Sequence, residues 1–326
     1  MISGLGPEQF EAMKRCRGAG RYFWLDVLVG GEGVPAEDAR RQLRDELAVP
    51  DHALDVLFDW SPETRSRKKY KYHADAEHVV FAFNLITRPD APLEEGPAAI
   101  DPVEVHVLVH GDYLVTVHDE PATLQPPPDE SPPEERGEKY LVFFALFEMT
   151  TTLFETLNAL GEELQELEID QAAGRGNPAT NMRAVSALRG RLTKLRRLAG
   201  RQAVVFSHVA EEIEQVKGLE GSGRYFERID DQLGRLVDGV DALGRSLAAV
   251  IDQGINLTIF RLTVVATIFL PLTVLTSFFG MNFGWLTGHI TSPMDFLIFG
   301  VGSLAAAVVI SLVVLWRDLP LLARRD

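Results

Sequence analysis

Polar side chains recur at helical spacing inside one long apolar stretch of this sequence. From Leu262 to Phe279 there are 18 residues without a charge, followed by Gly280-Met281-Asn282. Steps of three and four residues place on one helical face a stripe that is mostly small or polar. Its members are Asn256, Ile259, Thr263, Ala266, Leu270, Thr273, Ser277 and Gly280. Such residues either let helices pack closely in lipid or line a water-filled path, and spacing alone leaves both interpretations open.

Two apolar segments have the length of membrane spans. A helix rises 1.5 Å per residue, so about 20 residues cross a hydrocarbon core about 30 Å thick. The first span is expected at about 262–279, and a second uncharged run of 21 residues, Phe296–Trp316, follows the loop 280–293. Two spans this close together predict a C-terminal transmembrane hairpin.

The distribution of basic residues predicts the orientation of this hairpin. The loop 280–293 has no Lys or Arg, whereas Arg261 precedes the first span and Arg317, Arg324 and Arg325 follow the second. The positive-inside rule then places both termini in the cytoplasm. Residues 1–20 show no charged-then-apolar leader, which agrees with a cytoplasmic N-terminus. We expect a multi-pass protein of the inner or plasma membrane.

An apolar heptad pattern precedes the first span. Its positions are Phe226, Ile229, Leu233, Leu236, Val240, Leu243, Leu247 and Val250. Continued to Phe279, the pattern predicts one helix from Gly223, about 85 Å long. Because a sustained apolar seam needs partners, we expect this helix to self-associate around an axis.

The N-terminal part of the chain reads as an α/β domain. Strands are expected at Tyr22–Val29, Val79–Ile86, Val103–Val109 and Tyr113–Val117, with helices at Pro35–Leu47 and Asp51–Trp60. The sequence His110-Gly111-Asp112 predicts a hairpin between the last two strands.

From Tyr140 the pattern is helical. An acidic helix, Tyr140–Ala173, should pair with a basic antiparallel helix, Ala179–Lys217. The predicted fold is therefore an α+β cytoplasmic domain followed by long helices and a two-span C-terminal transmembrane hairpin. Its expected divisions are a cytoplasmic α/β domain at 1–139, a helical region and stalk at 140–255 and a membrane domain at 256–326.

Composition and motifs argue against several functions. The net charge of −15 disfavours a nucleic-acid partner, and a single cysteine, Cys16, allows no internal disulfide or thiolate cluster. No hydrolase or phosphate-loop motif stands out, so neither an enzyme nor an ATP-driven pump is expected. Five histidines are interpreted as ordinary surface or strand residues and not as metal ligands: His73, His78, His106, His110 and His118.

One segment resembles a known family. The octapeptide Ala266–Thr273, ATIFLPLT, followed by Gly280-Met281-Asn282 near the outer end of the penultimate span, resembles the first transmembrane helix of the CorA family of divalent-cation channels. The order of the preceding parts is similar as well, so the resemblance covers most of the chain. It implies a homopentamer whose first spans surround one pore.

The resemblance also implies roles for individual residues. Gly280, Met281 and Asn282 would form the outer selectivity site, where Asn282 presents a ring of amide oxygens to a hydrated ion. Pore-lining positions are matched by Asn256, Leu270, Thr273 and Ser277. Among them, Asn256 is a further candidate contact for the ion, and Leu270 occupies the family's hydrophobic constriction. In the family, intracellular Mg²⁺ bound between cytoplasmic domains closes the pore, and Glu227 and Asp230 are candidates for that regulatory site.

We therefore expect a channel that moves Mg²⁺ down its electrochemical gradient, with Zn²⁺ and Co²⁺ as related ions. A dication gains about 4.6 kcal/mol per 100 mV on entering a negative interior, so influx needs no ATP. The loop Gly284–Pro293 has no acid, where many relatives carry Met-Pro-Glu. Some relatives with such loops move Zn²⁺. In the alternative that this chain is a proton-coupled Zn²⁺ transporter, His289 would be the titrating group. The third hypothesis is a non-conducting membrane sensor or scaffold. Expected partners are lipid, divalent cations and further copies of the chain.

Overall fold

The protein is described by a computed structural model. It covers residues 1–5, 7–31, 33–59, 72–88, 100, 102–122, 124, 138–173, 178–281, 284, 288 and 292–322. The chain divides into two compact units, Met1–Ala248 and Ala249–Asp326. The basic cluster at 65–71 and the Pro/Glu-rich loop at 125–136 lie outside the described residues.

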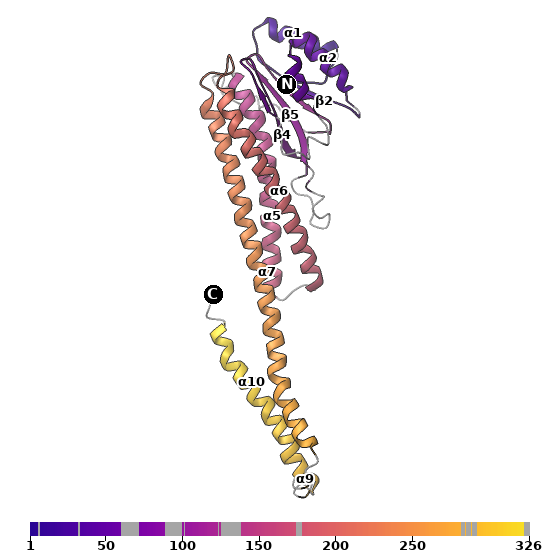
Figure 1. The fold of residues 1–326 in the computed structure, drawn as a ribbon, viewed down its shortest axis with the longest axis vertical. Helices are drawn as coiled ribbons and strands as arrows, with labels where there is room; N and C mark the ends of the chain where they lie inside the picture. Colours follow the sequence, from indigo (N-terminus) through magenta and orange to yellow (C-terminus); the bar gives the residue numbers. More distant parts are fainter. Residues whose placement is uncertain are drawn as a thin grey trace. The chain divides into compact units, whose positions relative to one another are not determined.

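A six-stranded mixed sheet forms the centre of the first unit (Figure 1). Its spatial order is β1-β2-β6-β5-β4-β3. The parallel pairs are β1 with β2 and β2 with β6, and the other neighbours are antiparallel. The bounds are Ile2–Ser3 for β1, Phe23–Leu28 for β2, Tyr72–Ala74 for β3, His78–Ile86 for β4, Pro102–His110 for β5 and Tyr113–His118 for β6.

The four strands expected from apolar runs are confirmed as β2, β4, β5 and β6, and the predicted hairpin joins β5 to β6. The short strands β1 and β3, and helix α1 (Pro7–Gly18), were not predicted. Strands of two or three residues are too short to show an alternating pattern, so only their neighbours in the sheet reveal them.

Helices cover both faces of the sheet, which explains why its strands read as nearly continuous apolar runs. On one face, Leu25, Leu108 and Val115 share a core with α1, α2 (Ala36–Leu47) and α3 (Asp51–Leu57). On the opposite face, the rings of Phe81 and Phe83 lie 6.5 and 6.4 Å from that of Phe206.

Three long helices follow the sheet: α5 (Glu138–Ala172), α6 (Pro178–Ile213) and α7 (Gly223–Gly280). All three were predicted to within a few residues, and the break at 174–177 lies outside the described residues. The predicted charge pairing between α5 and α6 is confirmed by Arg191, which donates to Glu163 at 3.0 Å. Arg196 instead pairs with Asp241 on α7.

The apolar seam of α7 is buried inside its own chain from Phe226 to Leu247, except for the partly buried Leu243. The Phe226 ring lies 6.4 Å from that of Phe206 on α6. A Cβ added to Gly239 would lie 2.8 Å from Leu157 on α5. Helices α5 and α6 therefore supply partners for this seam within the chain, so the seam alone does not require self-association, which stays a prediction.

Three helical stretches among the described residues are long and apolar enough to cross a membrane: Tyr140–Ala172, Gly223–Gly280 and Phe296–Val313. Two had been predicted. The apolar window of the first is 39% buried inside the protein, against 0% and 11% for the other two. In the third, a π-helical turn at Phe296–Val301 leads into α10 (Gly302–Leu322). A short helix, α9 (Pro293–Asp295), comes just before it.

A buried polar chain crosses β2 and β6. The Trp24 indole donates to the Thr116 hydroxyl at 3.0 Å, and Thr116 donates to Asp26 Oδ1 at 2.6 Å. His118 Nε2 lies 3.2 Å from Asp26 Oδ1, and its Nδ1 lies 2.7 Å from the carbonyl oxygen of Glu120. Since both ring nitrogens face acceptors, the charged imidazolium satisfies this site.

The pKa of His118 makes the stability of the folded chain depend on pH. Burial alone lowers this pKa, but the hydrogen bond and the charge of Asp26 outweigh burial and raise it. The stabilisation from charged His118 is fully present below the pKa of histidine in the unfolded chain, about 6.5. It is lost as the pH rises through the higher pKa of His118 in the folded chain. We expect the melting temperature of the full-length protein in detergent to fall across this window, and His118→Gln to flatten the fall. The exposed control His208→Gln should keep the wild-type slope, and equal slopes in all three proteins would contradict the assignment.

Candidate functional site

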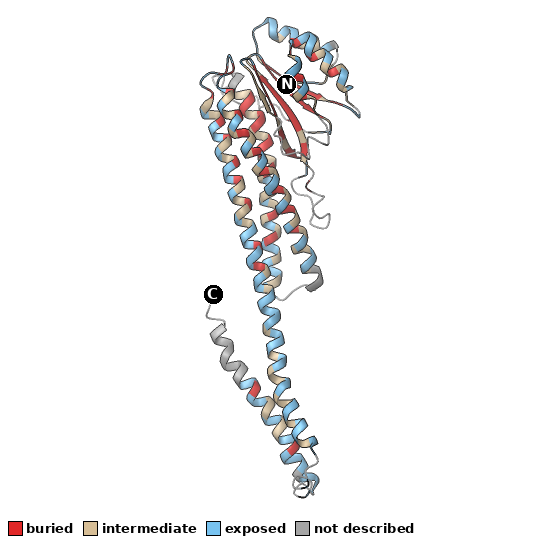
Figure 2. Cartoon of the chain, viewed as in Figure 1, coloured by how far each residue is buried: buried red, intermediate tan, exposed pale blue. Residues whose placement is uncertain are grey.

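The polar stripe of α7 lies on an uncovered face of the helix. All eight of its residues, from Asn256 to Gly280, are exposed (Figure 2). The partly covered residues of the same segment project about half a turn away, at 3.6 residues per turn. They are Phe260, Val264, Thr267, Ile268, Pro271, Leu272, Leu275 and Phe279. In the second unit, therefore, the small and hydroxylated face of α7 is not the face that the chain itself covers.

The threonines of this segment satisfy their own donors. The Thr263 hydroxyl donates to the carbonyl of Ile259 at 2.9 Å, and that of Thr273 donates to Phe269 at 2.8 Å. The hydroxyl hydrogen is then used within the helix, and the oxygen lone pairs remain for an outside partner. The acceptor oxygens that these threonines leave exposed suit the hydrogens of water around a cation.

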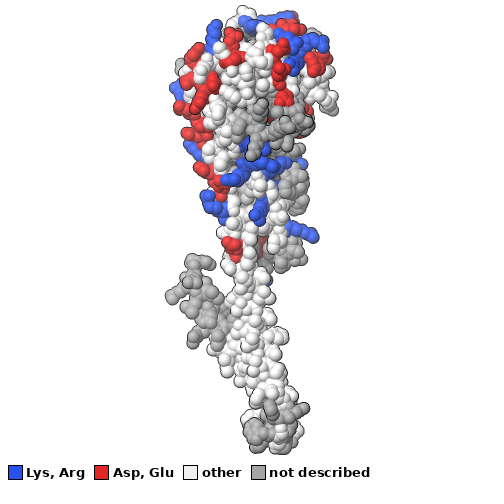
Figure 3. All heavy atoms as spheres, viewed as in Figure 1, with Lys and Arg blue, Asp and Glu red and all other residues white. Residues whose placement is uncertain are grey.

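Charge is absent from this part of α7. Beyond Arg261 the helix has no Lys, Arg, Asp or Glu, and the visible surface of this segment is uncharged in Figure 3. In the middle of the stripe, the Leu270 side chain is 70% exposed. The next residue, Pro271, has no N–H, so the Thr267 carbonyl receives no helical hydrogen bond from it. The stripe thus combines hydroxyl oxygens with two large apolar groups, Ile259 and Leu270.

The helix ends at the predicted tripeptide. The amide of Met281 donates to the carbonyl of Phe278 at 3.2 Å, and the Met281 side chain is 49% exposed. Among the described residues, a Cβ added to Gly280 would meet nothing within 4 Å. Their packing therefore does not require glycine there. Asn282 and the loop candidate His289 lie outside the described residues.

The two regulatory candidates lie near the start of α7. Glu227 is exposed, and Asp230 is partly buried. Partial burial, and then the negative charge of Asp231, raise the pKa of Asp230. A carboxylate in such surroundings is stabilised by any cation that approaches it. Within the described residues, these acids and the polar stripe occupy separate parts of the helix.

Four of the five weighed histidines have partners in or beside the sheet, as expected of strand residues. His106 Nε2 lies 2.8 Å from Glu104, and His118 contacts Asp26. The ring of His110 stacks on Tyr113 with centroids 4.5 Å apart, and His78 Nδ1 lies 3.3 Å from Asp75.

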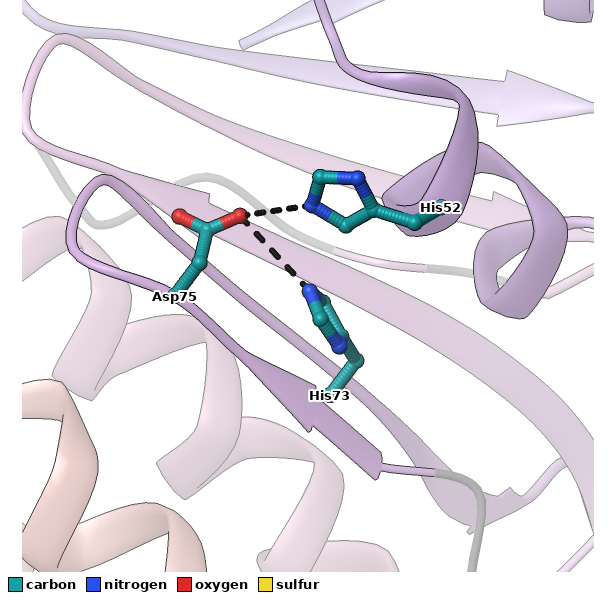
Figure 4. A group of neighbouring side chains, drawn as sticks. All are labelled: His52, His73 and Asp75. Carbon is teal, nitrogen blue, oxygen red and sulfur yellow. Dashed lines mark hydrogen bonds and ion pairs between the residues drawn. The ribbon is translucent and has the colours of Figure 1, made fainter.

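His73 differs from the other four, because it lies beside His52 and Asp75 (Figure 4). Sequence reasoning did not weigh His52. It lies on α3, while His73 belongs to β3 and Asp75 to the turn that follows. No regular spacing links these positions, so only the folded chain reveals the cluster.

Comparison with known proteins agrees with this architecture. Residues 23–317 match the model of the family described as CorA-like Mg2+ transporter protein. The CorA magnesium transporter from Methanocaldococcus jannaschii shares the fold, with a TM-score of 0.57 and 17% identity over 90% of each chain.

Curated relatives carry a different ion in their names. The zinc transport protein ZntB of Photorhabdus laumondii is 31% identical over 136 residues, which are 39% of each chain. ZntB of Pectobacterium carotovorum is 28% identical over 159 residues, or 46% of this chain and 47% of that protein. The matches thus span less than half the length of these relatives. The family match, by contrast, extends from β2 through α7 into α10, and the chain belongs to the CorA-like family.

Proposed function

We propose that this protein carries divalent cations across a membrane along a path lined by α7. The observation that carries the proposal is the exposed polar stripe, which lies opposite the face that the chain covers. In lipid, polar side chains gain most by facing one another or water, so copies of this helix would turn their stripes inward. The family suggests five copies around the axis.

Two of the three long apolar stretches would span the membrane: the C-terminal part of α7 and the segment beginning at Phe296. The apolar residues of α5 serve instead to cover the sheet and α6, as its 39% buried window suggests. The absence of basic residues from the intervening loop supports cytoplasmic termini. The domain divisions at 139 and 255 belong to the same proposal.

The residues of the stripe would have distinct roles. Asn256, Ile259, Thr263, Ala266, Leu270, Thr273 and Ser277 would line the path, and Leu270 would form its apolar constriction. Gly280, Met281 and Asn282 would make the outer site. Neutral oxygens can hold a hydrated ion without trapping it, because Mg²⁺ gives up its water reluctantly. Glu227 and Asp230 remain candidates for control by intracellular cation.

Two ions are supported by different observations. The family description and the shared fold favour Mg²⁺. The curated relatives are named for zinc, and the acid-free outer loop with His289 favours Zn²⁺, with proton coupling. We therefore propose divalent-cation influx with Mg²⁺ or Zn²⁺ as the principal ion, and Co²⁺ as a further substrate.

Flux into liposomes tests the proposal and separates the ions. Purified full-length protein is reconstituted, and Mg²⁺ or Zn²⁺ entry is measured with and without a pH gradient. Mg²⁺ entry that ignores the gradient identifies a magnesium channel, and Zn²⁺ entry that the gradient accelerates identifies a coupled zinc transporter. No entry of either ion would contradict transport and favour the sensor or scaffold.

The face of α7 that lines the path is tested by a matched pair of threonines. Both Thr273 and Thr276 are exposed and donate to their own helix at 2.8 Å, but only Thr273 lies on the stripe. Replacement by valine keeps the shape and removes the acceptor. We expect Thr273→Val to reduce flux about tenfold, equivalent to about 1.4 kcal/mol at the barrier. Thr276→Val should stay within about twofold of wild type on the same scale. Because the two side chains project about 60° apart, the reverse order would turn the path around the helix toward Thr276.

The outer site is tested at Gly280. Alanine fits there without a clash against any residue that the structure describes, so Gly280→Ala should leave expression and oligomer size unchanged. Flux should nevertheless be lost if backbones from several copies converge at this position. Gly234→Ala, at another unobstructed glycine of α7, is the control and should transport normally. Wild-type flux in Gly280→Ala would remove the glycine from the proposed outer site.

A further inference from the structure

A second group of potential metal ligands lies in the first unit, at the edge of the sheet. His52 on α3 and His73 on β3 both direct an imidazole toward the carboxylate of Asp75 (Figure 4). One ligand atom from each residue lies within 4.8 Å of the others. The proposed ion path on α7 uses none of these residues.

The two oxygens of Asp75 have separate tasks. Its Oδ1 accepts hydrogen bonds from the backbone amides of Glu77 at 2.8 Å and His78 at 2.7 Å. These bonds fix the carboxylate at the β3–β4 turn. Its Oδ2 lies 3.0 Å from His52 Nε2 and 3.6 Å from His73 Nε2. A metal ligand is most effective when other bonds hold its orientation in this way.

His73 carries the mark of a missing partner. Its Nε2 is buried and has no hydrogen bond to any residue that the structure describes, because 3.6 Å from Asp75 Oδ2 is too long for one. A buried polar nitrogen without a partner is unfavourable. Two ligands of one tetrahedral zinc, each about 2.0–2.1 Å from it, lie about 3.3 Å apart. The gap between His73 and Asp75 is therefore close to the spacing that a shared ion imposes.

The types of the three ligands favour Zn²⁺ over Mg²⁺ at this site. Two imidazoles with one carboxylate suit Zn²⁺, whereas Mg²⁺ prefers an octahedron of oxygens. The His52 side chain is 56% exposed, so an ion can reach the cluster from solution and water can complete its coordination.

We propose that His52, His73 and Asp75 bind one Zn²⁺ per protomer, with water as the fourth ligand, and that they do not bind Mg²⁺. The ion would replace the hydrogen that His52 Nε2 donates to Asp75 Oδ2. It would also join α3 to β3, the edge strand of the sheet. This site is independent of which ion the protein transports.

Equilibrium binding to full-length protein in detergent tests the proposal. Zn²⁺ is titrated against a coloured zinc chelator with excess Mg²⁺ present, for wild type, His52→Gln and His73→Gln. We expect wild type to bind one more Zn²⁺ per protomer than either variant, or to bind it about 100-fold more tightly. Co²⁺ should give wild type alone the visible absorption of a tetrahedral site.

Controls separate this site from other zinc contacts. His208→Gln removes an exposed histidine whose Nδ1 lies 2.8 Å from the Val204 carbonyl oxygen of its own helix, and it should bind like wild type. His52 is exposed, so His52→Gln should fold normally. If His73→Gln does not fold, the comparison of His52→Gln with wild type alone tests the zinc site. Equal zinc stoichiometry and affinity in wild type and His52→Gln would overturn the proposal. Flux plays no part in this measurement, so its result stands apart from the transport assignment.

Discussion

The threonine hydroxyls of α7 bond to their own helix, and the proposed path depends on this constraint. A polar side chain at membrane depth is costly unless its donor is satisfied. Thr263 and Thr273 meet that condition without a neighbour, so a single chain tolerates them on an uncovered face. What remains exposed is oxygen, and in the proposed assembly a ring of such oxygens would form an uncharged, acceptor-rich surface. That surface would pass a hydrated dication because it would not bind the ion as carboxylates do.

The two ends of α7 face different surroundings. Near its start, an apolar seam is buried by α5 and α6, which leaves that part of the helix few apolar groups for other copies. Beyond Arg261, the exposed large side chains, such as Leu262, Val265 and Phe269, are apolar, and this suits contact with lipid. Assembly would therefore depend mainly on the polar stripe and on surfaces of the first unit. The heptad pattern alone does not predict assembly.

The sequence was sufficient for elements whose side chains repeat with a clear period. Strands β2, β4, β5 and β6, and helices α5 to α7, were located because their apolar residues follow strand or helix spacing. The spacing of apolar residues in a helix does not reveal which other helix packs against it. For this reason the apolar seam of α7 was expected to pack against other copies of the chain. The site on α7 could be proposed because it lies within one helix. The cluster of His52, His73 and Asp75 could not, since three elements bring it together.

The buried ion pair between α5 and α6 complicates an obvious line of mutagenesis. The acidic end of α5 invites charge removal to test whether it gathers cations, yet Glu163 binds Arg191, whose side chain is only 3% exposed. Removing that carboxylate breaks an ion pair of a buried guanidinium, and breaking a buried pair costs about 3–5 kcal/mol. Neutralising all the acidic residues at this end of α5 would therefore weaken the packing of α5 against α6 as well as change the local electrostatic potential. Any altered transport could then reflect damaged folding.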